Sequence, residues 1–562
     1  MTTPVTITPG MQRPPPPQKA RPPRRRPMVA NLALLGGVVM GFGLVAGQLL
    51  FLGLKNGPQI ALAVTEPSAT SFARPDLIDR NGRLIATDVE APSLFADPAL
   101  VQDRDEVVEK LATVLSDLDQ ADLRRSLSDK ARRFVWIRRG LSPRVAQRVH
   151  DLGLPGISFR RELRRAYPAG ELAGHIIGSV NVDNKGTSGI EKYVDDVIGV
   201  EPVHSATLSD RAPVRLAIDL GVQHTLEDEL ETALRRYHTE GAAGLIMDVA
   251  TGEIVASASL PRIDPSRPAM ALDPKNLNRV TDGTYELGSV MKTMTIAMAL
   301  DAGTATADTI LDVRQPLTAG RFTITDLHPA GRPLTVAEVF TRSSNVGAGM
   351  LALDAGAAKV TGFLKRAGLL DPMKTEAGPV KAPQLPAQWE RAELITVSYG
   401  HGIALSPLQF AAAAASLVNG GTRVTPTYLK YHLETSPKRE TVVSPATSLE
   451  MARLMRLNVL DGEGTGKRAD VPGYRVGGKT GTAELADNGG YQKKAVLSSF
   501  LGTFPADEPR YVTFVLLFEP EASVDTGGQR TASTNAAPVT ARIIRRIAPQ
   551  LGVAPLQTAL SQ

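Results

Sequence analysis

The sequence contains no cysteine among its 562 residues. Without thiols, the chain cannot form disulfide bonds, zinc sites with thiolate ligands, iron–sulfur clusters or cysteine nucleophiles. The absence fits an oxidising compartment, although many cytosolic proteins also lack cysteine. Asp76 and Asp79 have no metal-ligand spacing around them, and we therefore expect neither a metal nor a cofactor.

Excess charge is nearly absent outside one short segment. The chain has 63 basic and 58 acidic residues, a net charge of +5. Residues 1–27 hold six of the basic residues and no acid, and their many prolines indicate an extended, solvated tail. Removing those six leaves 57 basic residues against 58 acidic ones, so the rest of the chain offers no general basic surface for nucleic acid.

One long hydrophobic run follows this tail. Residues 28–54 carry no charge, and at about 1.5 Å per residue such a helix exceeds the roughly 30 Å hydrocarbon core of a bilayer. The positive-inside rule places residues 1–27 in the cytoplasm and residue 55 onward outside, which predicts a single-pass signal anchor. A cleavable signal peptide is the alternative, with Ala61-Leu62-Ala63 as its cleavage site, but its apolar region usually has only about 7 to 15 residues.

Two regions of different composition follow the anchor. Residues 55–210 carry dense, alternating charge and no evident nucleophile with its base, which indicates a scaffold. Residues 211–550 are weakly charged and rich in glycine, and residues 551–562 form a C-terminal tail. The predicted strands of the second region are Gly244–Val249, Glu253–Ser259, Arg475–Glu484, Leu497–Phe504 and Tyr511–Phe518, and its predicted helices include Leu226–Tyr237 and Ala537–Ile547. Because tight turns join antiparallel strands, we expect a mixed α/β fold in which helices flank an antiparallel sheet.

The first candidate site combines a serine with a lysine three residues later. Ser289 precedes Lys292, and residues 293–300 are apolar on nearly every face, which predicts a buried helix with Ser289 in its first turn. This spacing places both side chains on one helix face. A serine becomes nucleophilic when a base takes its proton, and a lysine can be that base when desolvation lowers its pKa.

Two further motifs indicate no chemistry when each is taken alone. Ser343-Ser344-Asn345 is then better explained as a helix cap or turn. Lys479-Thr480-Gly481-Thr482 is then better explained as a strand edge whose glycines permit close packing. Together with Ser289 and Lys292, however, they give the order Ser-x-x-Lys, Ser-x-Asn and Lys-Thr-Gly, which is the signature of penicillin-interacting serine enzymes.

On these motifs the chain resembles the class B penicillin-binding proteins, most closely the division-specific septal peptidoglycan D,D-transpeptidases. The resemblance extends from the anchor to about residue 545. Its other landmarks include Asp79-Arg80-Asn81-Gly82, Tyr167-Pro168, Gly189-Ile190-Glu191, Thr251-Gly252-Glu253-Ile254, His328-Pro329 and Ser406-Pro407-Leu408-Gln409. Leu287 departs from the family pattern, which usually has proline there, without touching the reacting groups.

The resemblance implies a role for each residue of the first two motifs. Ser289 attacks the penultimate D-Ala carbonyl of a peptidoglycan stem peptide and forms an acyl-enzyme, while Lys292 accepts its proton. Ser343 relays that proton toward the leaving D-Ala amine, and Asn345 binds the substrate backbone and helps to hold Lys292. A side-chain amine of a second stem then takes the acyl group, which produces a crosslink.

The third motif is implied to bind the substrate. Lys479 supplies positive potential for the substrate carboxylate, and Thr480 or Thr482 supplies a hydroxyl. The strand that contains these residues and Gly481 pairs through its edge with the extended stem peptide. The backbone N–H groups of Ser289 and Thr482 form an oxyanion hole. A further residue near family landmarks, His401, has no motif partner and is interpreted as structural.

The resemblance also implies the architecture and the partners. The anchor would carry an elongated pedestal of the dimerisation type over residues 55–210 and a transpeptidase domain over residues 211–550, in the periplasm at the division site. The pedestal does not resemble a polymerase, so a SEDS-type glycosyltransferase and divisome proteins are the implied partners. The substrates are stem peptides on lipid-linked or nascent glycan strands, and β-lactams are covalent inhibitors.

Other functions use the same motifs. Among enzymes, the alternatives are an elongation-specific class B transpeptidase, or a D,D-carboxypeptidase or β-lactamase in which water deacylates the serine, although the last two are generally shorter. Among non-enzymes, the alternatives are a β-lactam-acylated sensor and a septal scaffold with a vestigial serine. A sensor requires a cytoplasmic signalling domain, and the 27 proline-rich residues at the N-terminus are not one.

Overall fold

The computed structural model describes residues 40–48, 72–202, 212–320, 322–430, 440–487 and 490–556. The chain divides into two units, Met1–Thr70 and Ser71–Gln562. In the first unit, residues 40–48 form a helix inside the predicted anchor. Within the described ranges, no helix is both long and apolar enough to cross a membrane. The predicted tail 1–27 and most of the predicted anchor 28–54 lie outside the described residues.

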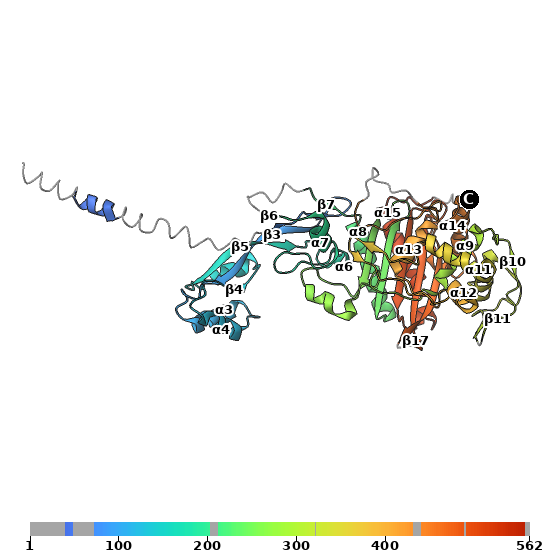
Figure 1. Cartoon of the computed structure of the whole chain (residues 1–562), viewed down its shortest axis with the longest axis horizontal. Coiled ribbons are helices and arrows are strands. Elements are labelled where there is room, and N and C mark those ends of the chain that lie inside the picture. Colours follow the sequence, from blue (N-terminus) through green and yellow to red (C-terminus); the bar gives the residue numbers. More distant parts are fainter. Residues whose placement is uncertain are drawn as a thin grey trace, which may run out of the picture. The chain divides into compact units, whose positions relative to one another are not determined.

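The N-terminal part of the second unit is built around the long strand β3 (Leu84–Ala96) (Figure 1). The other strands are β1 (Phe72–Ala73), β2 (Leu77–Ile78), β4 (Val135–Arg138), β5 (Ile157–Ala166), β6 (Glu201–Pro202) and β7 (Val214–Arg215). The helices are α3 (Arg104–Val114), α4 (Gln120–Ser128), α5 (Pro143–His150), α6 (Gly174–Ile177), α7 (Gly189–Tyr193) and the π-helix η1 (Val194–Ile198). Strand β3 pairs antiparallel with β2, β4 and β5, and helices α3, α4 and α5 share a small apolar core with it.

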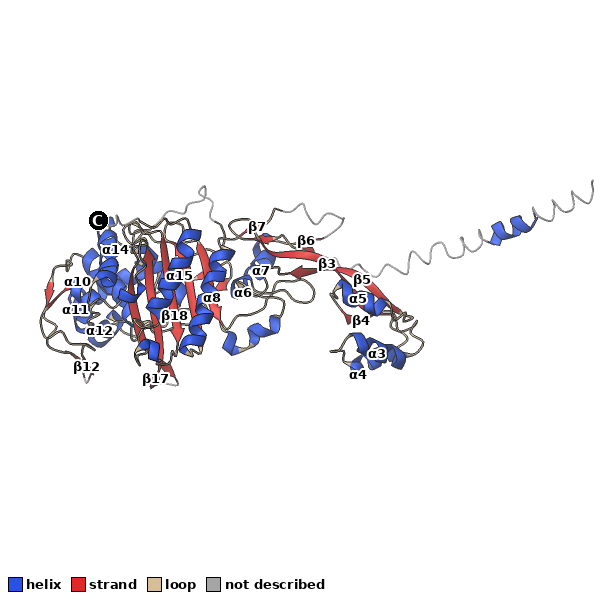
Figure 2. Ribbon diagram, turned by 180° about the vertical axis from the view of Figure 1, so that it is seen from behind, coloured by secondary structure: helices blue, strands red, loops and turns tan. Residues whose placement is uncertain are grey.

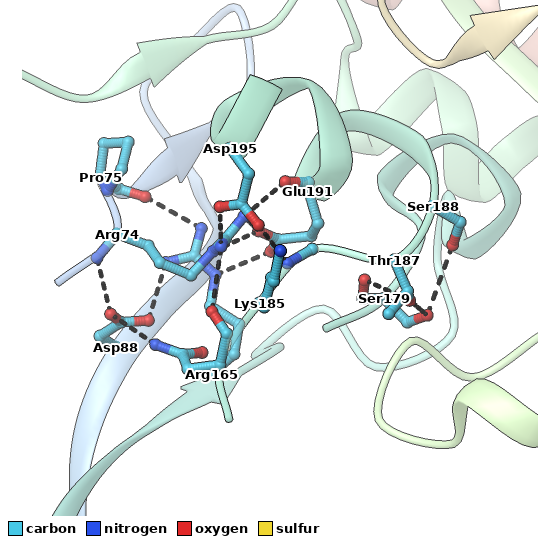
Figure 3. A network of polar contacts seen from close by, with 12 residues as sticks. Arg74, Pro75, Asp88, Arg165, Ser179, Lys185, Thr187, Ser188, Glu191 and Asp195 are labelled. Carbon is cyan, nitrogen blue, oxygen red and sulfur yellow. Dashed lines mark hydrogen bonds and ion pairs between the residues drawn. The ribbon is translucent and has the colours of Figure 1, made fainter. Parts of the chain in front are cut away.

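A buried network of ion pairs connects β3, β5 and α7 with the segment that follows β1 (Figure 3). Arg74 Nε donates to Glu191 Oε2 at 2.9 Å, and Arg165 Nε donates to Glu191 Oε1 at 2.7 Å. Arg165 Nη1 also donates to Asp88 Oδ1 at 3.1 Å, and Arg74 pairs with Asp195. The side chains of Arg74, Arg165 and Glu191 are completely buried. Glu191 is therefore the carboxylate that both buried guanidinium groups share, and each of them has one further carboxylate partner.

A Glu191→Gln variant is expected to lower the free energy of unfolding by about 3 kcal/mol, because it leaves two buried guanidinium groups short of a countercharge. Denaturant unfolding of the full chain measures this change. The matched control is Glu90→Gln, whose pair with Arg161 has side chains 54% and 84% exposed and is worth at most about 1 kcal/mol. Equal losses in the free energy of unfolding for the two substitutions would contradict the conclusion that Glu191 stabilises both buried guanidinium groups.

The C-terminal part centres on a five-stranded antiparallel sheet in the order β16-β17-β18-β8-β9. Its strands are β8 (Gly241–Asp248), β9 (Ile254–Leu260), β16 (Gly477–Asp487), β17 (Gly490–Phe504) and β18 (Tyr511–Phe518). Every residue of the central strand β18 is buried, which explains its almost continuous apolar sequence. Among the described residues, β16 and β9 are the edge strands of this sheet.

Helices cover both faces of the sheet. Helices α8 (Leu220–Tyr237) and α15 (Ala536–Gln550) lie side by side on one face, where Val515 and Leu517 of β18 join their core (Figure 2). On the other face, α13 (Pro407–Ser416) packs against β18 and β8. The remaining α-helices are α9 (Lys292–Asp301), α10 (Val336–Thr341), α11 (Asn345–Arg366), α12 (Arg391–Ser398) and α14 (Pro445–Leu460).

Short elements complete this part of the chain. The 3₁₀-helices are η2 (Pro268–Leu272), η3 (Pro274–Asn276), η4 (Gly288–Met291), η6 (Lys467–Ala469) and η7 (Val524–Thr526). The short strands are β10 (Ile310–Leu311), β11 (Leu317–Ala319), β12 (Phe322–Ile324), β13 (Leu334–Thr335), β14 (Lys374–Thr375) and β15 (Gly378–Pro379). They pair among themselves as β10–β13, β11–β12 and β14–β15.

The predicted mixed α/β fold with an antiparallel sheet is confirmed, while some boundaries were wrong. The helix predicted to begin at Leu226 begins at Leu220, because the Asp219 side chain caps it by accepting from the backbone N–H groups of Gly221 and Val222. The strand predicted from Leu497 begins at Gly490, because the hairpin with β16 continues beyond the apolar stretch.

Candidate active site

The first motif lies where a 3₁₀-helix passes into a buried α-helix. Helix η4 contains Ser289, and α9 begins at Lys292, with every residue from Lys292 to Ala299 buried. The predicted buried helix is therefore confirmed, but Ser289 lies in the turn that precedes it. A 3₁₀-helix has three residues per turn, so positions three apart are directly aligned. This turn brings the Ser289 hydroxyl next to the Lys292 amine.

The Lys292 amine is the centre of the site and touches four oxygen atoms. Lys292 Nζ lies 2.8 Å from Ser289 Oγ and 2.7 Å from Asn345 Oδ1. It lies 3.1 Å from the carbonyl oxygen of Ser343 and 3.2 Å from Ser343 Oγ. The Asn345 amide oxygen and the Ser343 carbonyl can only accept hydrogen bonds, so they orient two N–H groups of the amine. The structure thus brings together all four predicted catalytic residues.

The electrostatic surroundings favour the neutral form of this amine. The Lys292 side chain is completely buried, and this burial lowers its pKa well below the usual 10.5. The charge of Lys479 lowers the pKa further, while Asp326 raises it. Desolvation is therefore the dominant effect, and it favours the neutral amine, which is the form that can accept a proton.

The second motif is held in an unusual backbone conformation at the start of α11. Ser343 has φ +62°, in the left-handed region that non-glycine residues rarely adopt. The next residue, Ser344, is the N-cap of α11, and its hydroxyl accepts from the backbone N–H of Gly347. This turn directs both the carbonyl and the hydroxyl of Ser343 to Lys292. Strain of this kind is characteristic of functional sites.

Asp326 supports this turn and was not predicted from the sequence. Its Oδ2 accepts from Ser344 Oγ at 2.7 Å, and its Oδ1 accepts from the backbone N–H groups of Asn345 at 2.6 Å and Val346 at 3.0 Å. The carboxylate therefore fixes the start of α11, where a negative charge is also favourable. Asp326 follows β12 and belongs to no recognised motif, and only its neighbour His328-Pro329 was noted as a landmark.

An Asp326→Asn variant is expected to acylate about tenfold more slowly, because an amide cannot accept all three hydrogen bonds and the motif loses its orientation. The variant also removes the charge that raises the Lys292 pKa, so the rise of the acylation rate with pH should move to lower pH. A pH profile of the acylation rate constant measures both effects. Asp308→Asn, at an exposed position, is the matched control and should change neither; an unchanged profile in Asp326→Asn would refute this role.

The third motif lies on the edge strand β16. Lys479 is completely buried, its Nζ lies 5.8 Å from the centre of the Phe340 ring, and burial lowers its pKa to about 7. Thr480 Oγ1 donates to Thr465 Oγ1 at 2.8 Å. The exposed Thr482 hydroxyl accepts from the backbone N–H of Ala532 at 3.2 Å. All four residues of this motif therefore lie on one strand. The outer edge of this strand has no partner strand among the described residues.

Two glycines allow the first and third motifs to pack backbone against backbone. A Cβ atom at Gly481 would lie 2.6 Å from the carbonyl oxygen of Leu287. At Gly288, which has φ +59°, it would lie 2.6 Å from the carbonyl oxygen of Thr482. Larger residues are therefore excluded at both positions. The close packing puts the backbone of Ser289 next to that of Thr482, as an oxyanion hole formed by their N–H groups requires.

Asn458 and Thr465 also belong to this site, and sequence reasoning did not find them. Asn458, buried on α14, donates from Nδ2 to the carbonyl oxygen of Gly478 at 2.8 Å, and its Oδ1 accepts from the backbone N–H of Thr465 at 3.1 Å. These bonds join α14 to the start of the third motif. Nothing in the local sequence signals such long-range partners. In the described part of the chain, no group of three or more His, Asp or Glu side chains is arranged to hold a metal ion.

This arrangement has the parts needed for acyl transfer. It combines the Ser289 hydroxyl with the buried Lys292 amine, which also contacts a second hydroxyl, that of Ser343. Beside them lies the edge of β16, which carries the buried Lys479. The individual roles of these residues stay a prediction.

Comparisons with known proteins extend over both parts of the chain. The family model described as "Penicillin binding protein transpeptidase domain" matches residues 242–545, and the one described as "Penicillin-binding Protein dimerisation domain" matches residues 70–201. The chain is 40% identical over 488 residues to "Probable peptidoglycan D,D-transpeptidase FtsI" of Caulobacter vibrioides, covering 86% of this chain and 82% of that protein. It is 28% identical over 551 residues to "Peptidoglycan D,D-transpeptidase FtsI" of Escherichia coli, covering 92% of each.

A solved structure shares the fold. The crystal structure of penicillin-binding protein 3 from Mycobacterium tuberculosis, complexed with aztreonam, matches with a TM-score of 0.67 and 24% identity. The match covers 86% of this chain and 98% of that one. At this level of identity the likeness establishes the fold alone.

Proposed function

The chain belongs to the class B penicillin-binding proteins, and we therefore propose that it is a peptidoglycan D,D-transpeptidase that crosslinks stem peptides through an acyl-enzyme on Ser289. The observation that carries the proposal is the convergence on one buried amine. Lys292 Nζ contacts Ser289, Ser343 and Asn345 at 2.7 to 3.2 Å, and its burial lowers its pKa.

In the acylation step, Ser289 Oγ attacks the carbonyl carbon of the penultimate D-Ala while Lys292 Nζ takes the hydroxyl proton. The backbone N–H groups of Ser289 and Thr482 stabilise the negative oxygen of the tetrahedral intermediate. When the intermediate collapses, the bond to the terminal D-Ala nitrogen breaks, and that nitrogen receives the proton through Ser343 Oγ. The products are an ester on Ser289 and free D-Ala.

The donor peptide is proposed to bind along the open edge of β16. Its C-terminal carboxylate would lie near Lys479, with the hydroxyl of Thr480 or Thr482 as a further partner, and Gly481 permits the close packing of this strand on η4. Asn345 Nδ2 would bind the peptide backbone. A carboxylate at this place also raises the pKa of Lys479, which burial lowers to about 7 in its absence, so donor binding and protonation of Lys479 support each other.

Attack by the side-chain amine of a second stem on the ester completes the crosslink and restores Ser289. The chain would need a separate polymerase, and we propose a SEDS-type glycosyltransferase together with divisome proteins. We also propose that residues 28–54 anchor the protein in the bacterial inner membrane with residues 1–27 in the cytoplasm. Residues 55–210 would form the pedestal and residues 211–550 the transpeptidase domain, both in the periplasm at the division site, with residues 551–562 as a tail.

Labelling of the full chain in detergent with a fluorescent penicillin tests the chemistry. We expect one covalent adduct, and mass spectrometry of the digested protein should place it on Ser289. An adduct on another residue, or no adduct, would contradict the proposal. Depletion of the protein in growing cells tests the septal role separately. Blocked septation with continued elongation supports that role, whereas blocked elongation with intact septation would assign the protein to elongation.

A further inference from the structure

One carboxylate on the open face of β16 has no part in the mechanism so far. Along this strand, Thr482 and Glu484 are exposed, whereas Gly481, before Thr482, and Ala483, between the two, are buried. Side chains two residues apart project from the same face of a strand, so Glu484 projects from the same face as the Thr482 hydroxyl. No ion pair within the described residues involves the Glu484 carboxylate.

A second acidic group lies on the other side of the nucleophile. Glu286 precedes Ser289 by three residues, and its Oε1 accepts from the backbone N–H of Gly402 at 2.8 Å. The backbone N–H of Gly288 donates to the carbonyl oxygen of Gly400 at 3.4 Å, and a Cβ atom at Gly400 would lie 2.2 Å from the carbonyl oxygen of Gly288. The loop of residues 399–402 is therefore pressed against the backbone directly before Ser289.

His401 lies in this loop, and the charges of both Glu286 and Glu484 act on its imidazole. Its ring centre lies 5.2 Å from that of Tyr399, whose ring centre lies 6.0 Å from Lys292 Nζ. Burial lowers the pKa of His401, Glu286 and Glu484 both oppose this effect, and Lys292 adds to it. Both carboxylates therefore act electrostatically on the loop that is pressed against the backbone before Ser289.

The charges along β16 run from positive to negative. Lys479 lies at one end of the motif and Glu484 at the other, and Thr482, beside Gly288, lies between them. A strand rises about 3.3 Å per residue, so Glu484 lies about 7 Å beyond Thr482, which is the reach of one to two residues of an extended peptide. With its carboxylate at Lys479 and its scissile carbonyl at Ser289, a donor peptide extends its preceding residue toward Glu484.

We propose that Glu484 forms a specificity subsite for a positively charged group on the donor side chain that precedes the acylated D-Ala. This inference rests on the proposed function, because the placement of the donor follows from acylation at Ser289. Each stem carries a side-chain amine at which crosslinks form, so a stem that is not yet crosslinked through this amine presents an ammonium group here. A stem already crosslinked through it presents a neutral amide. The subsite therefore favours uncrosslinked stems as donors.

Three penicillins with one scaffold provide the test, because their acyl side chains occupy the place of the preceding donor residue. Ampicillin carries an ammonium group on this side chain, benzylpenicillin carries hydrogen at the same carbon and carbenicillin carries a carboxylate. The second-order acylation rate constants of the full chain are compared for the three compounds. We expect the order ampicillin, benzylpenicillin, carbenicillin, and we expect Glu484→Gln to reduce the ratio of ampicillin to benzylpenicillin by about two- to fivefold.

Two further variants make this result specific. Glu484→Arg should reverse the order and favour carbenicillin. Glu508→Gln changes the net charge by the same amount as Glu484→Gln, at an exposed position in the turn between β17 and β18, and it should leave all three rate constants unchanged. The rate constant for benzylpenicillin, whose acyl side chain is uncharged, should be similar in all of these proteins, which shows that each one folds.

Two results would overturn the inference. If Glu484→Gln leaves the ratio of ampicillin to benzylpenicillin unchanged, Glu484 does not contact the donor side chain. If the wild-type chain prefers carbenicillin, a cation governs this region, and the exposed Arg530, two residues before the N–H that binds Thr482, is then the group responsible. Either result leaves the transpeptidase proposal intact, because in both cases the penicillins still acylate Ser289.

Discussion

A Ser289→Ala variant is expected to form no covalent adduct with a fluorescent penicillin and to crosslink no stem peptides. The substitution removes the Ser289 hydroxyl oxygen, which lies 2.8 Å from the Lys292 amine. The fold should be unaffected, because Ser289 is half-buried and the loss of its hydroxyl creates no large cavity. Denaturing gel electrophoresis after labelling measures the adduct. Analysis of crosslinks in cells that depend on the variant measures the function.

The matched control is Ser116→Ala, in the exposed connection between α3 and α4, which should label like the wild-type protein. Labelling of Ser289→Ala at the wild-type level would show that another residue is the nucleophile. Unchanged septal crosslinking in cells, together with lost labelling, would instead leave the protein as a scaffold whose serine is not used.

A Lys292→Met variant is expected to be acylated about a thousandfold more slowly, because the base that takes the Ser289 proton is gone. Methionine has a similar length and no charge, so it fits the fully buried position. Its sulfur cannot donate to Asn345 Oδ1 or to the carbonyl oxygen of Ser343, and each unsatisfied acceptor costs about 1 to 3 kcal/mol. A time course of acylation at saturating penicillin separates the slow chemical step from penicillin binding.

Thermal unfolding of the same variant checks that it folds, and Lys359→Met, at an exposed position of α11, is the matched control. A Lys292→Met protein that folds and keeps more than about a tenth of the wild-type acylation rate would assign the base to another group. Because the pKa of Lys292 is lowered by burial, wild-type acylation should increase with pH and level off well below pH 10.5. In Lys292→Met this rise should be absent.

The sequence was sufficient to find the candidate catalytic residues because they belong to short motifs. Ser289 and Lys292 are three residues apart, so local helical geometry alone predicts their contact, which the structure confirms at 2.8 Å. The alternation and length of apolar stretches likewise predicted the strands of the antiparallel sheet, with β18 at Tyr511–Phe518 as expected. Where the prediction used only apolar residues, it failed at polar ends, as at Asp219, which caps α8.

The supporting residues could not be predicted because their partners are distant in the chain. Asp326 bonds to the start of α11, and Asn458 bonds to Gly478 and Thr465, without any local pattern that marks them. The positive φ of Ser343 is also invisible in the sequence, because serine has no preference for that conformation. Such features exist only when the elements have packed.

The sequence by itself determined which groups are candidates to react, because the identity and spacing of the residues in each motif limit the chemistry that they can perform. The tertiary structure decided how reactive they are. It buries Lys292 and Lys479 completely, and this loss of water, rather than any property of lysine in the chain, lowers both pKa values. It also left Thr482 and Glu484 exposed while it buried Gly481 and Ala483, because the side chains of a strand take their surroundings from the elements packed beside it.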